Sequence, residues 1–147
     1  MMLRSSRFYL FIILLLSQSL SAAETLYQQD GIAINGYDPV SYQAKQRASK
    51  GDASHSYRWN NALWLFASAE NRSLFAADPE KYAPQYGGFC AYAASKNALA
   101  PTGPEAWTVK EGKLYLNYSK SIRTTWQKDI VGNIELADGY WPGLMNQ

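Results

Sequence analysis

Two stretches of the chain alternate between apolar and polar residues, and each stretch predicts a β-hairpin. From His55 to Asn60 every second side chain is aromatic or an imidazole, which is the period of a strand. Asn60-Asn61 suits a tight turn because asparagine tolerates a positive φ, and residues 62–67 form the returning strand. A second hairpin is expected over residues 107–118, with its turn at Glu111-Gly112.

Other segments begin with residues that favour helix starts, because Ser and Asp side chains accept backbone N–H groups and Pro suits the first turn. The expected helices run from Asp38-Pro39 to about Lys45, from Ser68 past Phe75, from Asp78-Pro79 to Tyr82, from Phe89 to Ser95, from Ser119 or Ser121 past Trp126, and from about Gly132 to Asp138. Hairpins and helices are interspersed without a βαβ rhythm. We therefore expect the α+β class, with a small mainly antiparallel sheet built from two β-hairpins and several short helices packed on it.

The first residues have the pattern of a secretory signal. Arg4 and Arg7 precede the apolar run 8–16, and the small residues Ser21-Ala22-Ala23 suit signal peptidase. The run is about half the roughly 20 residues that a spanning helix needs. We expect a cleaved signal peptide over residues 1–23 and a single domain over residues 24–147. The expected location is the periplasm, with no stable membrane anchor after cleavage.

Cleavage would also change the charge of the chain. The full sequence has 14 Lys and Arg against 12 Asp and Glu, and removing Arg4 and Arg7 leaves 12 of each sign. The mature chain is therefore neutral, and it has no dense cluster of Lys and Arg. Nucleic-acid binding needs a positive stripe, so a nucleic-acid partner is not expected.

Several blocks of the chain are similar to a known family. Gly36-Tyr37-Asp38-Pro39-Val40, residues 66–72 and Asp78-Pro79-Glu80-Lys81-Tyr82 resemble a YHS domain. Residues 84–93, 112–118 and 137–142 resemble blocks of exported bacterial YHS-domain proteins, so the likeness covers nearly all of the mature chain. YHS modules of copper-transporting ATPases carry cysteines thought to bind metal, but Ser41, Ala67 and Asn71 stand in those places here. That metal-binding argument does not transfer.

Cys90 is the one cysteine, so the chain has no internal disulfide. It follows Gly87-Gly88 at the start of an expected helix, where backbone N–H groups would stabilise a thiolate. Some exported YHS-domain proteins are selenoproteins, and if their selenium takes the position of Cys90, the resemblance favours redox chemistry there. Three readings stay open: a redox or nucleophilic thiol, a ligand of a soft metal, and a buried, inert thiol.

Three further residues are candidates for a site. His55, the one histidine, could act as a base for Cys90 or join it in binding a soft metal such as copper. Two such ligands do not complete a zinc site, which takes four. Tyr86 and Tyr92 could line a small-molecule pocket, or they could pack in the core with their hydroxyls bonded at its margin.

These observations favour a binding module over an enzyme. The hypothesis is a periplasmic YHS-domain protein that binds a small ligand or a soft metal ion, with copper as the candidate metal and Cys90 as the expected contact. The first alternative is a thiol-based redox protein in which Cys90 is catalytic and reacts with the thiol of a partner protein. The second alternative is a structural module in which Cys90 is inert.

Overall fold

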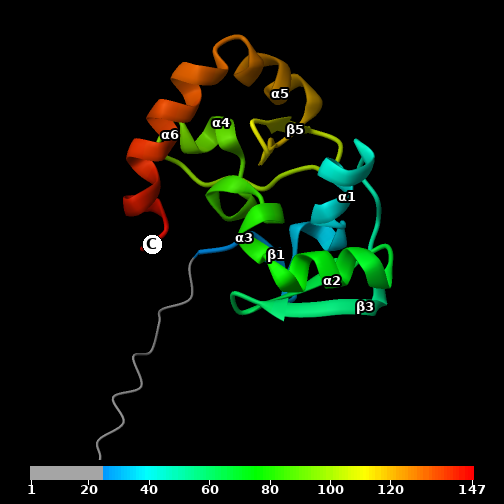
Figure 1. Cartoon of the computed structure of the whole chain (residues 1–147). Coiled ribbons are helices and arrows are strands. Elements are labelled where there is room, and N and C mark those ends of the chain that lie inside the picture. Colours follow the sequence, from blue (N-terminus) through cyan, green and yellow to red (C-terminus); the bar gives the residue numbers. More distant parts are fainter. Residues whose placement is uncertain (1–24) are drawn as a thin grey trace, which may run out of the picture.

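The computed structural model of the chain describes residues 25–147 (Figure 1). The predicted signal peptide lies outside the described residues and stays a prediction. Within residues 25–147, none of the helices combines the length and the apolar character needed to cross a membrane. The described chain has the α+β architecture expected from the sequence, with a mixed four-stranded sheet, a separate hairpin and six packed helices.

The larger sheet is built around the first predicted hairpin, which the structure confirms. Its strands are β3 (Asp52–Trp59) and β4 (Ala62–Phe66), joined by Asn60 and Asn61 at φ of 49° and 62°. Two short strands, β1 (Gln28–Gln29) and β2 (Ile32–Ala33), complete the order β1-β2-β4-β3. Strand β2 runs parallel to β4, whereas the other pairs are antiparallel, so the sheet is mixed.

The second predicted hairpin also forms, from β5 (Trp107–Lys110) and β6 (Lys113–Leu116). The expectation that the two hairpins share one sheet is wrong, because β5 and β6 form a two-stranded sheet of their own. The physical reason is that each face of this hairpin packs against a different apolar cluster, and neither of its strands pairs with a strand of the larger sheet. Leu114 and Leu116 enter the core beside the larger sheet, while Tyr115 between them points into a second core.

The three helices nearest the larger sheet begin where the sequence indicates. They are α1 (Pro39–Lys45), α2 (Ala69–Ala77) and α3 (Pro79–Tyr82). Asp38, Ser68 and Asp78 cap them by accepting backbone N–H groups of the first turn, as predicted. These starts depend on neighbouring residues alone, which is why the sequence reveals them.

The later helices differ more from expectation. Helix α4 covers only Ala91–Ala94, and Cys90 precedes its first turn as the N-cap residue, with a non-helical ψ of 119°. Of the two candidate caps, Ser119 begins α5 (Lys120–Gln127). Helix α6 (Ile130–Leu144) is twice the expected length and includes Pro142. Its final turns are held because Trp141 and Leu144 pack in the second core.

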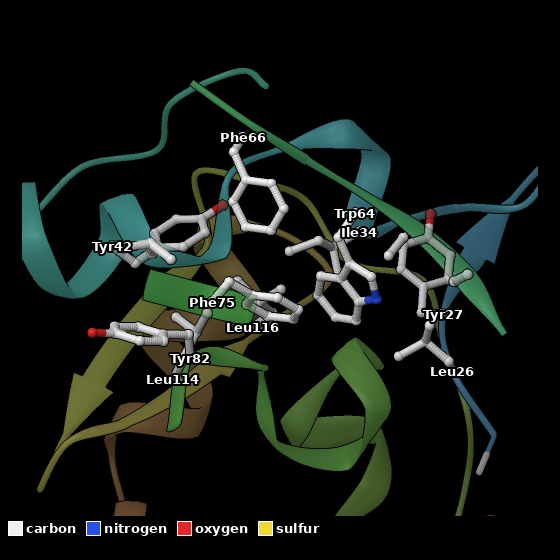
Figure 2. Packing of buried hydrophobic residues seen from close by; sticks show 13 residues of the cluster. Leu26, Tyr27, Ile34, Tyr42, Trp64, Phe66, Phe75, Tyr82, Leu114 and Leu116 are labelled. Carbon is white, nitrogen blue, oxygen red and sulfur yellow. The ribbon is translucent and has the colours of Figure 1, made fainter. Parts of the chain in front are cut away.

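The apolar interior consists of two clusters. The first cluster lies on the larger sheet and is rich in rings (Figure 2): Phe75 packs against Trp64 at 5.0 Å and Phe66 at 5.1 Å between ring centroids. The second cluster lies between α4, α5 and α6. It combines Tyr86, Tyr115 and Trp126 with the small side chains of Ala91, Ala94 and Ala137. Figure 1 shows α4 and α6 on the far side of the molecule from β3.

One buried carboxylate organises the first cluster. Asp38 is fully buried, and its Oδ1 accepts the N–H groups of Val40 and Ser41 at the start of α1. Its Oδ2 accepts the N–H of Ala67 at 2.9 Å and the side-chain amide of Asn71 at 2.8 Å. Four donors therefore replace water around the charge, and they tie α1 to the start of α2.

Candidate functional site

The structure answers whether Cys90 is open or buried. The residue is 1 % exposed, and its N–H donates to the carbonyl of Ala100 at 3.0 Å. The redox hypothesis and the metal-binding hypothesis both require a solvent-accessible thiol at the start of a helix. In this conformation the thiol is not accessible to solvent. A reagent or ion therefore reaches the sulfur only if the surrounding segments move.

The surroundings of the sulfur are nevertheless polar. The backbone N–H of Tyr118 donates to Cys90 Sγ at 3.3 Å, and the thiol donates to Asn117 Oδ1 at 3.4 Å. The same Oδ1 accepts the N–H of Tyr92 at 3.0 Å, so Asn117 acts as the side-chain cap of α4. Asn117 Nδ2 is buried and has no hydrogen-bond partner within residues 25–147. Cys90 thus joins the start of α4 to the residues that follow β6.

His55 lies elsewhere in the fold. It is half-buried on β3, near Asp52, whereas Cys90 precedes α4 on the other side of the molecule (Figure 1). Hydrogen bonds from Ser54 are the main reason that the pKa of Asp52 is lowered, and His55 adds a smaller effect. The described residues contain no group of three or more His, Cys, Asp or Glu that could hold a metal ion. The Cys90–His55 metal site stays a prediction that no contact in this fold supports.

Tyr86 has an unusual backbone and a well-placed hydroxyl. Its φ of 55° lies in the left-handed region, and Gly87 and Gly88 follow it with φ of 59° and 81°. For a tyrosine this conformation costs on the order of 1–3 kcal/mol. The hydroxyl donates to Asp138 on α6 at 2.9 Å. Burial, with a smaller effect of the Asp138 carboxylate, raises the pKa of Tyr86 above the usual range of tyrosine.

Tyr86 lines a pocket of about 190 Å³ at the boundary between the two clusters. Its walls come from the turn after β3, from α3, from the turn holding Tyr86 and from α6. The lining residues are Leu26, Trp59, Asn60, Glu80, Ala83, Pro84, Gln85, Tyr86, Gly87 and Trp141. Trp59 belongs to the margin of the first cluster and Trp141 to the margin of the second. The pocket therefore exists only where the two clusters meet.

Tyr92 does not share this position. Its ring lies under the ammonium group of Lys96, at 5.2 Å from the centroid, and the described lining of the pocket does not include it. Both tyrosines pack in the second cluster, but only Tyr86 lines this pocket. Sequence reasoning missed Trp59, Trp141 and Glu80 as lining residues. The sequence places Trp59 in the first hairpin, and Glu80 and Trp141 in blocks that resemble YHS domains. It does not show that the three side chains meet at one pocket.

Comparison with protein-family models, with curated proteins and with solved structures found no significant match to the chain. The resemblance to YHS domains therefore stays a prediction from the sequence blocks.

Proposed function

We propose that the mature chain is an exported YHS-type module that binds a small ligand, and that the ligand occupies the pocket beside Tyr86. The observation that carries this proposal is the left-handed Tyr86 on the pocket wall. Backbone strain of this kind persists where the surrounding structure enforces it, and it concentrates at functional sites. The pocket offers aromatic surface together with a few polar groups, which is the usual make-up of a small-molecule site.

In this proposal the ligand contacts Tyr86 and not Cys90. The thiol is buried, and it is not part of the described pocket lining. Tyr86, by contrast, contributes directly to the wall, and its hydroxyl is fixed by Asp138. A wall residue that is already ordered loses little conformational entropy on binding, which favours affinity.

The test uses the indole N–H signals of Trp59 and Trp141 in nuclear magnetic resonance spectra. A panel of small cations, neutral molecules and anions is added to the folded protein at millimolar concentration. We expect at least one compound to shift both signals in a saturable way. Ala83→Leu, which fills the pocket, should abolish the shifts, whereas Ala77→Leu, at the exposed last position of α2, should not. If no compound shifts either indole, the proposed function is wrong.

A second candidate, the thiol-based redox protein, is favoured by one observation. The N–H of Tyr118 donates to Cys90 Sγ at 3.3 Å, so the sulfur faces a polar group and not hydrocarbon alone. Alkylation by iodoacetamide separates this candidate from an inert thiol. Labelling of the native protein well before global unfolding would support gated access to Cys90. Labelling that occurs only at the rate of global unfolding would leave Cys90 with a structural role.

A further inference from the structure

We propose that the pocket beside Tyr86 binds a small organic cation, an ammonium group that carries apolar substituents. This inference rests on the proposed function and names the ligand class for the same site. The charge, the aromatic surface and the size of the pocket support it.

The charge of the lining is negative. Among the described lining residues, Glu80 is the one with a formal charge, and it lies exposed in the first turn of α3. A second carboxylate, Asp138, lies behind the wall, where it accepts the hydroxyl of Tyr86. The neighbouring cation, Lys81, is directed instead to the ring of Tyr82, at 5.2 Å from its centroid. The pocket therefore favours a cation over an anion of the same shape.

The aromatic surface also suits a cation. Trp59, Tyr86 and Trp141 all line the pocket, and the rings of Tyr86 and Trp141 meet nearly edge to face at 5.9 Å between centroids. The face of an aromatic ring carries negative potential, and tryptophan is the strongest of these residues in attracting ammonium groups. Apolar substituents on the nitrogen would gain from contact with Leu26 and Ala83.

The size of the pocket limits the ligand. About 190 Å³ is less than the roughly 300–1,000 Å³ of sites for drug-sized ligands. A compact cation with few heavy atoms fits this description better than a nucleotide or a peptide. The carboxylate at the rim and the rings on the walls together define a site for an alkylated ammonium group.

The experiment compares three compounds of nearly one shape and different charge: choline, 3,3-dimethyl-1-butanol and 3,3-dimethylbutyrate. Their affinities for the folded protein are measured by titration of the Trp59 and Trp141 indole signals. We expect choline to bind about tenfold more tightly than the neutral alcohol, and the carboxylate to bind most weakly. Glu80→Gln should weaken choline binding about threefold and leave the affinity for the alcohol unchanged.

The matched control is Glu70→Gln, because Glu70 occupies the first turn of α2 as Glu80 occupies that of α3, but lies outside the described pocket lining. It should leave all three affinities unchanged. Equal affinity for choline and the alcohol, or no choline binding at all, would overturn the cation inference. The proposed function would still stand if another compound of the wider panel bound in the pocket. It would fall only if the whole panel failed.

Discussion

The two apolar clusters differ in how completely their polar atoms are satisfied. In the first cluster, Trp64 donates its indole N–H to the carbonyl of Trp59 at 3.0 Å, and Tyr42 donates its hydroxyl to the carbonyl of Pro104 at 2.9 Å. In the second cluster, the indole N–H of Trp126 is buried without a partner among residues 25–147. Asn117 beside Cys90 has an unpartnered amide as well. The buried polar side chains of the first cluster are thus hydrogen-bonded, whereas Trp126 in the second cluster and Asn117 at the start of α4 carry unpartnered N–H groups.

The residues that could bind a ligand or react also lie on one side of this division. Cys90, Asn117 and the left-handed Tyr86 all belong to the second cluster or adjoin it, and the pocket lies where this cluster meets the first. Strand β6 couples the two, because its successive side chains point to opposite sides. The first cluster, whose polar groups are hydrogen-bonded, can hold the second cluster in place. Strained functional sites persist where the surrounding structure fixes them in this way.

The largest expected contrast comes from the two buried asparagines. Asn71→Ala removes a donor from the buried Asp38 carboxylate, and we expect a loss of about 1.5–3 kcal/mol in the free energy of unfolding. Asn117→Ala removes the cap of α4 and the acceptor of the weakly donating Cys90 thiol but also removes an unpartnered amide, so we expect a smaller loss of about 1 kcal/mol. Urea unfolding followed by circular dichroism measures both. An equal or greater cost for Asn117→Ala would show that the second cluster is as well satisfied as the first.

A smaller contrast is expected from the two buried tryptophans. Trp64→Phe loses the hydrogen bond to Trp59, whereas Trp126→Phe loses an N–H that has no partner. Both changes remove similar apolar volume from fully buried positions, so the comparison isolates the polar atom. We expect Trp64→Phe to cost about 1 kcal/mol more in the free energy of unfolding. The same urea experiment applies, and a reversed order of the two costs contradicts the assignment of unsatisfied groups.

The smallest effect is expected above pH 10 and involves one tyrosine from each side. Burial is the main reason that the pKa values of Tyr42 and Tyr86 are raised. A tyrosine with a raised pKa keeps its proton in the folded state while the unfolded chain loses it, so its stabilising contribution is full below about pH 10 and falls as the pH rises. At pH 10.5 each of these two tyrosines should lower the free energy of unfolding by about 0.8 kcal/mol relative to neutral pH.

Phenylalanine variants show how much of the stability lost at alkaline pH comes from Tyr42 in the first cluster and how much from Tyr86 in the second. Tyr42→Phe and Tyr86→Phe should each flatten the dependence of the unfolding free energy on pH between 9 and 10.5. The measurement is thermal or urea unfolding at a series of pH values. If Tyr86→Phe leaves the dependence unchanged while Tyr42→Phe flattens it, Tyr86 ionises in a locally opened second cluster, and the pocket wall is less rigid than proposed.

Much of the fold could be predicted because its signals are local. Asp38, Ser68, Asp78 and Ser119 cap helices through donors two or three residues away, and Asn60-Asn61 makes its turn by itself. The extent of α6 could not be predicted. Its last turns pack in the second cluster despite Pro142, and that packing outweighs the local signal for a break.

By itself the sequence determined the two hairpins and the starts of the capped helices, and it singled out Cys90 and Tyr86 as residues of interest. Only the tertiary structure decided what surrounds them. The sulfur of Cys90 meets Asn117, 27 residues away, and Tyr86 meets Asp138, 52 residues away. Such meetings depend on how two clusters pack against β6, and no spacing along the chain encodes them. The burial of the thiol and the pocket at the boundary are therefore properties of the packing, whereas the helix starts and hairpin turns are properties of neighbouring residues.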